Sequence, residues 1–557
     1  MLNLILCWHF HQPDYRTGQG YFLPWAYLHA LKDYSDMAAH LEAQPAMRAV
    51  VNFVPTLLEQ LDDYATQFAS GHFTDPLLAR LAEPKLGRLS RADKQFLLEA
   101  CFRLHPPTML EPFPPYRELH ALSQQVQSQG EAGPDYFSAQ YFADLLTWYH
   151  LVWTGETVRR QYPLVLTLMQ KGRGFTPADR RALLDLIGEV ITGLIPRYKA
   201  LAERGQVELS TTPHSHPIAP LLIDFKAARE AKPGLPLPQA QAYPGGAERV
   251  KVHIDAARES HRAHFGAPPV GMWPAEGGVS QAALRQFSDA GVRWIASGEG
   301  VLMNSIRASG QDASRPCQWR CRPYRLTGTD TVCFFRDDYL SDLIGFEYKN
   351  WFARDAVRHF LHSLEDRYHY TNCQDHVVTV ILDGENAWDY YPYNGWYFLS
   401  ELYSALVEHP DIHLTTFADY LAQHPGSPMT LPRLVAGSWV YGDFTTWMGH
   451  PDKNRAWDLL CAAKTAYDTT LAQGALDAAS AQAAEALLRS CESSDWFWWF
   501  GDTNPAASVR AFDRLYRDKL RRLYRTLGLT PPADLEQPIS QGGGPAEAGG
   551  VMRRGSG

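Results

Sequence analysis

The stretch VVTVILDGENAWDYYPYNG, residues 377–395, indicates how this 557-residue chain folds. Its first six residues are apolar or β-branched and lead to Asp383, a pattern typical of a strand buried on both faces of a parallel sheet. A second stretch, PVGMWPAEGGVS at 269–280, leads in the same way to Glu276, before two glycines that let the backbone turn. Acids at the ends of such strands point into the crevice where ligands bind. We therefore expect Glu276 and Asp383 to face one site.

Seven short runs of this kind alternate with longer helical patterns. They cover residues 2–10, 48–53, 206–212, 269–274, 292–297, 331–335 and 376–382. Parallel strands need a crossover connection, usually a helix, so this alternation predicts an α/β fold in which βα units surround a parallel sheet or barrel.

The helical patterns outside these βα units predict the domain organisation. Residues 1–430 form the barrel domain, and it includes a helical insertion at about 60–200 that is either part of a substrate wall or a structural cap. Residues 431–530 predict a helical bundle that packs on the barrel and contributes aromatic residues to the site. The Gly-rich residues 531–557 are expected to be disordered.

Composition limits the kinds of partner. The formal charge is -9 and no large Lys/Arg cluster occurs, so neither nucleic acid nor an anionic membrane is expected to bind. The 16 Trp and 27 Tyr residues suit the faces of sugar rings as well as a core. The first residues, MLNLILCWHFHQP, have no basic segment of the secretory type, so we expect a cytoplasmic protein.

Two acids among aromatic residues suggest sugar chemistry. Glycoside hydrolysis with retention needs two carboxyl groups about 5 Å apart, and two strand ends across a barrel mouth can supply them. Asp337, Asp338 and Asp342, in FFRDDYLSDLIGF, compete for the second role, or they pair with Arg336. Each acid also has a structural interpretation, Glu276 as a solvated turn residue and Asp383 as a turn cap.

Two histidine pairs of identical spacing are further candidates. His9 and His11 alternate on the first strand, and His214 and His216 repeat the spacing in STTPHSHPIAP. Four histidines near one barrel mouth would suit a metal, which leaves a metal-dependent deacetylase or mannosidase as an alternative. We favour no metal and no other cofactor, with His11 and His216 forming hydrogen bonds with sugar hydroxyls.

Tryptophans follow the acidic segments and recur near the C-terminus. Trp388 lies five residues after Asp383, Trp439 lies in GSWVYGDFTTWMGH, and Trp498 lies in SSDWFWWFGD. These rings either stack on a ligand or pack between helices.

Five segments together resemble glycoside hydrolase family 57, whose members are retaining α-glucan enzymes. The segments are HQP at 11–13, GQVELSTTPHSHP at 205–217, WPAEGG at 273–278, ILDGENAW at 381–388 and SDWFWW at 494–499. The resemblance runs from residue 9 to about residue 502 and implies a (β/α)7 barrel with a helical C-terminal domain.

The resemblance also implies residue roles. Glu276 would be the nucleophile and Asp383 the general acid and base, which leaves Asp337 a supporting role. Trp439 and Asp495 would reach the site from the C-terminal side, and Arg336 would contact substrate. The candidate substrate-binding residues are therefore His11, His216, Trp273, Arg336, Asp337, Trp388, Trp439, Asp495 and Trp498.

The expected activity is retaining hydrolysis of α-glucans such as glycogen, starch or maltodextrin, of the α-amylase or amylopullulanase type. The motif DGENAW differs from DAELFG, which is common in the family's branching enzymes. A 4-α-glucanotransferase or a branching enzyme is the alternative, since the residues decide neither the acceptor nor the preference for α-1,4 or α-1,6 linkages.

Overall fold

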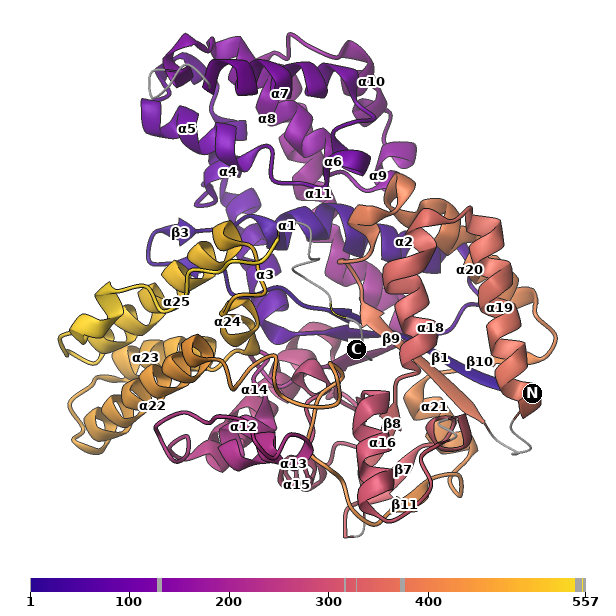
Figure 1. Ribbon diagram of the computed structural model, residues 1–557. Helices are drawn as coiled ribbons and strands as arrows, with labels where there is room; N and C mark the ends of the chain where they lie inside the picture. Colours follow the sequence, from indigo (N-terminus) through magenta and orange to yellow (C-terminus); the bar gives the residue numbers. More distant parts are fainter. Residues whose placement is uncertain are drawn as a thin grey trace.

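The computed structural model describes residues 2–127, 133–314, 317–326, 328–370, 376–545 and 553. A ring of parallel strands lies at the centre, with insertion helices above it and C-terminal helices beside it in the view of Figure 1. Among the described residues, no helix is both long enough and apolar enough to cross a bilayer.

Five parallel pairings form most of the central ring. Strand β1 pairs with β4, β9 and, at its start, β10, while β4 pairs with β5 and β6 pairs with β8. The bounds are β1 Leu2–Phe10, β4 Ala49–Phe53, β5 Val207–Thr211, β6 Trp294–Ser297, β8 Val332–Phe335, β9 Val377–Asp383 and β10 Ile412–Leu414.

Two further contacts close the ring. Isolated parallel bridges join Thr211 to Met272 and Gly271 to Trp294, so the segment at 271–272 lies between β5 and β6. On the other side the Asp337 amide donates to the Thr379 carbonyl at 2.7 Å, which joins the end of β8 to β9. The seven runs expected from the sequence therefore all contribute to the ring, and the prediction of a (β/α)7 barrel is confirmed.

Successive side chains of a strand point to opposite faces, so every second residue of each strand faces the interior of the ring. A small apolar cluster holds alternate residues of the strands, including Ile5 and Cys7 of β1 and Ile381 of β9. One step further along, His9 lies in register with both Asn52 of β4 and Asp383 of β9. Polar groups therefore replace the apolar core at the carboxyl face, which is the side of the ring where the strands end.

Helices cover the outside of the ring, and the remaining strands are short. The barrel helices are α1 Trp25–His29, α2 Ser35–Ala43, α12 Ala219–Ile223, α13 Ala228–Ala231, α14 Gly246–Phe265, α15 Gln281–Asp289, α16 Glu299–Ala308, α17 Cys317–Arg320, α18 Asp338–Asp342, α19 Ala353–Tyr370, α20 Trp396–Glu408 and α21 Phe417–Gln423. The short strands are β2 Arg16–Thr17, β3 Gly20–Tyr21, β7 Tyr324–Leu326 and β11 Met429–Leu431.

The segment between β4 and β5 is helical, as expected. Its helices are α3 Pro55–Ser70, α4 Pro76–Ala82, α5 Arg91–Ala100, α6 Pro106–Met109, α7 Pro114–Gln127, α8 Ala139–Val152, α9 Glu156–Gln161, α10 Pro163–Lys171 and α11 Pro177–Glu203. The last of them begins at a capping box, in which Thr176 and Asp179 satisfy each other's backbone amides. This long helix carries the chain back to the barrel at β5.

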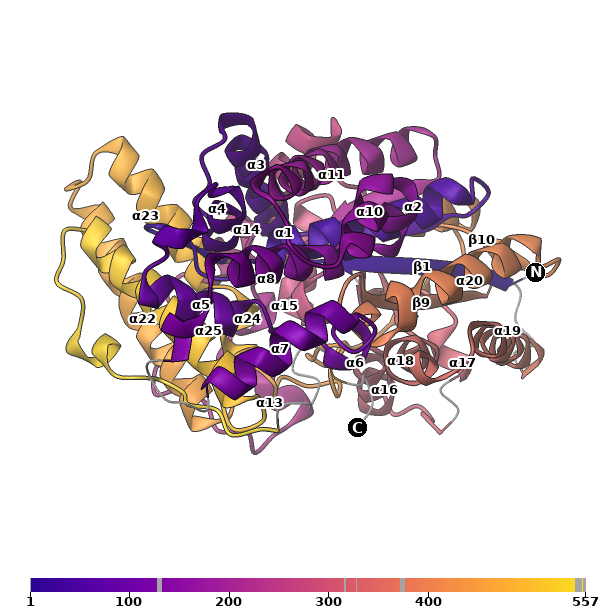
Figure 2. The ribbon, with the colours of Figure 1, turned by 90° about the horizontal axis from the view of Figure 1, so that it is seen from above.

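The C-terminal helices pack together beside the barrel, at the left of Figures 1 and 2. They are α22 Pro451–Ala472, α23 Ala478–Cys491, α24 Ser494–Trp499 and α25 Ala506–Thr526. The side chains of His11, just after β1, and Asp495, in α24, are 2.8 Å apart, so α24 lies over the carboxyl face.

The expected disorder of residues 531–557 is wrong for the first part of this tail. A 3-10 helix covers Ala533–Glu536, and Leu535 and Ile539 are buried against α25. The Ile539 amide also donates to Asp513 at 2.7 Å. Two apolar anchors and this hydrogen bond order the segment despite its glycines. Residues 546–552 and 554–557 lie outside the described residues.

A buried carboxylate joins the C-terminal helices to the barrel. Glu492 follows α23 and is fully buried, where it accepts hydrogen bonds from Tyr243 at 2.6 Å and Arg249 at 2.7 Å, and pairs with His253 at 2.7 Å. Burial alone would raise its pKa, but Arg249 and His253 outweigh burial and lower the pKa to about 2.

Replacing Glu492 with alanine is expected to lower the free energy of unfolding by about 3–5 kcal/mol, because it leaves the Arg249 charge buried and unpaired. Chemical denaturation followed by fluorescence measures the change, with the exposed Glu248→Ala on the same helix as Arg249 as the control. Since the folded-state pKa is depressed, this stabilisation is present above about pH 4.5 and is lost as the pH falls towards 2. Equal stabilities of the two variants would contradict the assignment.

Candidate active site

Glu276 lies at the carboxyl face, just beyond the bridging segment at 271–272. The residue is 7% exposed, and its two carboxyl oxygens have different hydrogen-bond partners. The Trp439 indole donates to Oε2 at 3.1 Å, and the Ser494 hydroxyl lies 3.1 Å from Oε1. The carboxyl group is therefore held by one side chain from the loop before α22 and one from α24.

The backbone around this carboxyl group is strained. Ser215, His216 and Glu276 adopt left-handed backbone conformations with φ of 60°, 58° and 58°. Residues other than glycine rarely adopt them. Such conformations cost about 1–3 kcal/mol each and cluster at functional sites. Ser494 contacts both His216 and Glu276 through its hydroxyl, so the strained residues meet at one point.

Asp383 ends β9 on the same face of the ring. Asn386 donates to its Oδ2 at 2.9 Å, which fixes the carboxyl group within its own turn. Burial raises the pKa of Asp383 to about 6, although Asn386 and the charges of His11 and Arg336 act in the opposite direction. The negative charge of Asp383 also acts on Glu276, so the two acids predicted from the sequence lie near each other at this face.

Glu276 retains its proton more strongly than Asp383. Burial, followed by the negative charges of Asp383 and Asp495, raises the pKa of Glu276 to about 8, while the hydrogen bond from Trp439 opposes this rise. Two interacting acids with raised pKa values are a common arrangement in sites of proton transfer.

A chain of hydrogen bonds runs from Glu276 into the barrel. Ser494 Oγ lies 2.8 Å from His216 Nδ1, and His216 Nε2 lies 3.1 Å from His9 Nε2. His9 Nδ1 in turn lies 2.7 Å from Asn52 Oδ1. Burial lowers the pKa of His9 to about 3 and that of His216 well below its usual range, so both rings are neutral near pH 7.

His11 lies beside this chain and pairs with the C-terminal helices. Its Nε2 is 2.8 Å from Asp495 Oδ1, while Ser493 donates to Asp495 Oδ2 at 2.6 Å. The other ring nitrogen, Nδ1, is buried and has no hydrogen-bond partner among the described residues. A hydroxyl group placed beside it could satisfy this nitrogen, and the role predicted for His11 stays a prediction.

His11, His216 and Asp495 lie close enough together to be considered as metal ligands. However, the His11 and His216 rings stack at 4.0 Å with an interplanar angle of 17°, so their in-plane lone pairs do not converge on one point. Both His216 nitrogens are also engaged by His9 and Ser494. This geometry favours hydrogen bonding over metal binding at these residues.

The structure places Arg336 and Asp337 in buried ionic networks. The three Arg336 nitrogens donate to the Ile381 carbonyl, Asp338 and Asp342 at 2.7 to 2.8 Å. Asp337 caps α18 by accepting a hydrogen bond from the Leu340 amide at 2.9 Å. It also forms an ion pair with Arg320 at 3.2 Å. The nitrogens of Arg336 are thus engaged by protein partners, and its guanidinium lies 5.6 Å from the Trp439 ring. The contacts predicted for Arg336 and Asp337 with substrate stay predictions.

The four candidate tryptophans have different surroundings. Trp439 is half-buried over Glu276 and meets the fully buried Trp273 edge-on at 5.2 Å. Trp498 is 8% exposed and packs near Trp447, with the Arg553 guanidinium 5.0 Å from its ring. These three rings lie around or behind the site, and Trp439 touches the carboxyl group.

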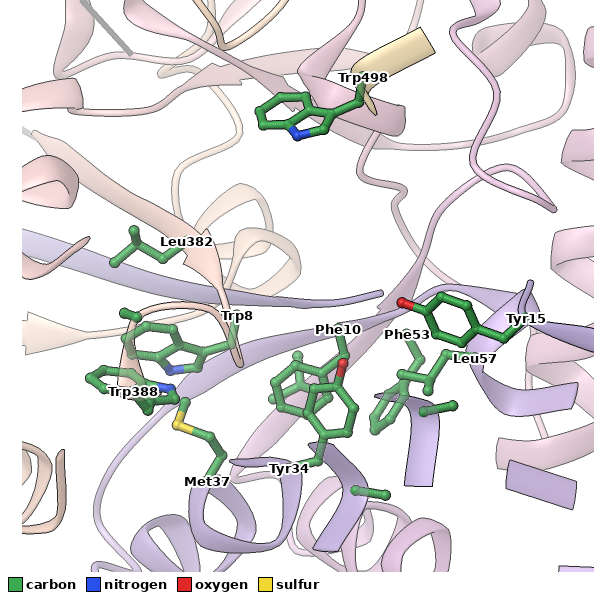
Figure 3. Close-up of a cluster of buried hydrophobic side chains, with 14 of the residues drawn as sticks. Trp8, Phe10, Tyr15, Tyr34, Met37, Phe53, Leu57, Leu382, Trp388 and Trp498 are labelled. Atoms are coloured by element: carbon green, nitrogen blue, oxygen red, sulfur yellow. The ribbon is translucent and has the colours of Figure 1, made fainter. Parts of the chain in front are cut away.

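Trp388 does not lie at the surface of the site, which corrects the expectation from its position after Asp383. Its ring is buried against Trp8, 5.9 Å away, and its indole donates to the Gly384 carbonyl (Figure 3). The chain turns sharply at Gly384, so an indole four residues later points back into the core instead of towards a ligand.

Two residues of the hydrogen-bonded chain, Asn52 and Ser494, were not among the candidates, and His9 was considered only as one of four possible metal ligands. A polar residue in the apolar run AVVNF was a signal for Asn52, because a buried amide needs polar partners. Ser494 carried no such signal, since its partners His216 and Glu276 are more than 200 residues away in the sequence.

Two carboxyl groups on the carboxyl face of a seven-stranded parallel barrel, among indoles and imidazoles, are typical of a glycoside hydrolase. The family model for glycosyl hydrolase family 57 matches residues 5–432. The chain therefore belongs to glycosyl hydrolase family 57, as its five segments predicted. No curated protein sequence matches the chain.

Several solved structures share the fold at low sequence identity. The branching enzyme of Pyrococcus horikoshii has a TM-score of 0.57 at 14% identity and covers 99% of each chain. The branching enzyme of Thermococcus kodakaraensis also has 0.57 at 14%, covering 94% of this chain and 89% of its own. The α-amylase AmyC of Thermotoga maritima has 0.53 at 13%, covering 96% and 98%. These likenesses show the fold.

Proposed function

We propose that the chain is a retaining α-glucan hydrolase with Glu276 as nucleophile and Asp383 as general acid and base. The observation that carries the proposal is that buried Glu276 and partly buried Asp383 lie at the same carboxyl face, where the charge of Asp383 acts on Glu276. Trp439 and Ser494 orient both oxygens of Glu276, as an attacking carboxylate requires. Family membership, and the activities named for the enzymes of similar fold, support an α-glucan as the substrate class.

The reaction would run in two displacements. Glu276 bonds to the anomeric carbon while Asp383 gives its proton to the leaving glycosidic oxygen. Asp383, now ionised, then takes a proton from water as the water attacks the glycosyl-enzyme, which frees Glu276 and restores the acid. Two inversions at one carbon give net retention. His11, with its unpartnered Nδ1, would bond a hydroxyl of the sugar.

A product time course on maltoheptaose and on pullulan tests this function. We expect only shorter oligosaccharides, with an unchanged rate in the presence of a chelator. Longer linear products would instead indicate a 4-α-glucanotransferase, in which a sugar hydroxyl replaces water, and new α-1,6 branches would indicate a branching enzyme. Loss of activity with the chelator would contradict the two-carboxyl mechanism and favour a metal-dependent one.

A further inference from the structure

The hydrogen-bonded chain behind Glu276 contains four consecutive links. They join Asn52 to His9 at 2.7 Å, His9 to His216 at 3.1 Å, His216 to Ser494 at 2.8 Å and Ser494 to Glu276 at 3.1 Å. Every member is buried, with the residues 0 to 7% exposed. Water therefore does not complete the links, and each must be filled by a hydrogen of the chain itself.

The orientation of Asn52 determines the hydrogens at the inner end. Thr212 donates to its Oδ1 at 2.9 Å, and its Nδ2 donates to Ser210 at 2.9 Å. The structure places Oδ1 2.7 Å from His9 Nδ1, although the Thr212 and Ser210 hydroxyls could serve either end of the amide. An amide oxygen only accepts, so in this orientation Nδ1 of His9 carries a hydrogen.

Counting hydrogens along the chain shows one too few for an ionised Glu276. Four links need four hydrogens, whereas two neutral imidazoles and one hydroxyl supply three. The fourth is either the carboxyl proton of Glu276 or a second hydrogen on one imidazole. A Glu276 anion beside two neutral rings would leave two lone pairs facing each other in one link, which is unfavourable in a buried site.

We infer that Ser494, His216 and His9 are positioning residues that form a proton relay, which takes up the proton of Glu276 as it attacks. The Glu276 O–H bond breaks while an O–H bond forms at Ser494, and the original hydroxyl hydrogen of Ser494 moves to Nδ1 of His216. The freed electron pair of Glu276 bonds to the anomeric carbon. The proton returns by the same path when the glycosyl-enzyme is hydrolysed. This inference rests on the proposed function.

The two acids need such a relay because their proton affinities are in the wrong order for their roles. The pKa of Glu276 is raised to about 8 and that of Asp383 to about 6, so near pH 7 the nucleophile holds a proton more strongly than the acid does. With the relay, Glu276 can attack without first losing a proton to solvent.

Charges around the chain act on both states of the relay. Glu276 faces the carboxyl groups of Asp383 and Asp495 and the guanidinium of Arg553, whereas the imidazole pair faces His11. Burial opposes a charged imidazole, and the developing negative charge of Glu276, 3.8 Å from the His216 Nδ1, stabilises it only until Glu276 bonds to the anomeric carbon. From then on Glu276 is a neutral ester, and the compensating negative charge is that of Asp383, which ionises as it protonates the leaving oxygen.

The pH profile of kcat/KM tests the relay, with an aryl α-maltooligoside as substrate. Its leaving group departs without a proton from Asp383, so the acid limb reports the ionisation of the nucleophile. We expect the wild-type acid limb below pH 7. Ser494→Ala should move it up by at least about 1 pH unit and keep the high-pH rate within about tenfold, and Ser494→Thr should restore the wild-type limb. An equal loss at every pH would overturn the relay.

Asn52→Asp tests the relay at a residue that does not touch Glu276, so an effect carried by the relay must pass through His9, His216 and Ser494. A through-space negative charge would move the acid limb upwards, because it disfavours a second anion. The relay predicts a downward shift, since a carboxylate beside His9 stabilises the protonated imidazole pair. If this variant does not fold, His9→Gln serves instead, and it should raise the limb as Ser494→Ala does. An upward shift in Asn52→Asp, or an unchanged limb in His9→Gln, would overturn the relay.

Nitrogen-15 NMR of the histidines in the free enzyme needs no substrate, so it decides even if no α-glucoside is cleaved and the proposed function fails. We expect a hydrogen on Nδ1 of His9 and on Nε2 of His216. A bare Nδ1 on His9 would mean that the Asn52 amide is reversed. The chain would then close with ionised Glu276 and two neutral rings, which would overturn the relay.

Discussion

Glu276→Gln is expected to lower kcat for maltoheptaose cleavage by on the order of 10⁴-fold or more. The amide has nearly the same size and still accepts from Trp439 Nε1, so the site keeps its shape, but an amide does not form the covalent intermediate. Substrate binding should change little, and isothermal titration with maltoheptaose measures it alongside the rate. The matched control is Glu299→Gln, in which a partly buried acid paired with Arg320 undergoes the same change. Its rate should stay within about fivefold of wild type.

The stereochemistry of chemical rescue identifies the role of Glu276. In Glu276→Ala, azide can enter the vacated space and attack from the side of the missing carboxylate. A single inversion of an α-linked substrate then gives a β-glycosyl azide. Formation of the α-glycosyl azide in this variant would reverse the roles proposed for the two acids.

The barrel was predictable because each strand is buried on both faces and has a continuous apolar sequence. The weakest case is the run at 269–274, which contributes only the bridges at Gly271 and Met272. A Cβ at Gly271 would lie 2.1 Å from the Trp294 ring, so glycine is required where the neighbouring strand passes closely. Short additional strands such as β7 and β11 depend on pairing partners about 100 residues apart, which local patterns do not reveal.

The site was predictable where an acid ends a strand, because strand direction decides where its side chain points. The aromatic residues were harder to place, since an indole serves equally well in a core or at a ligand. Trp388 is buried in the core, and Trp439 holds Glu276. Contacts made by Ser494 and Asp495 depend on how the C-terminal helices pack on the barrel. That packing is fixed by distant residues such as Glu492, so the resemblance to a family was needed to place Asp495.

Asp383→Asn is expected to lower kcat for maltoheptaose by about 10²–10⁴-fold, because the leaving glycosidic oxygen then receives no proton. An aryl α-maltooligoside with a good leaving group should still form the glycosyl-enzyme at close to the wild-type rate. Hydrolysis of that intermediate would be slow without a general base, so a rapid burst of aryl product should precede a slow steady state. If no burst occurs and both substrates are slowed equally, Asp383 does not act by protonating the leaving group, and the assignment of Asp383 as the acid is contradicted.

The pH dependence of kcat/KM with maltoheptaose tests whether Asp383 must carry a proton for activity. The acid must carry its proton to donate it, so kcat/KM should fall as the pH rises through about 6, and Asp383→Asn should lack this alkaline limb. Asp337→Asn is the matched control, since Asp337 caps α18 and should affect stability while the limb stays in place. Azide should rescue Asp383→Ala by attacking the glycosyl-enzyme from the side opposite Glu276, which gives the α-glycosyl azide. With the β product from Glu276→Ala, this pair of anomers would assign one face of the sugar to each carboxyl group.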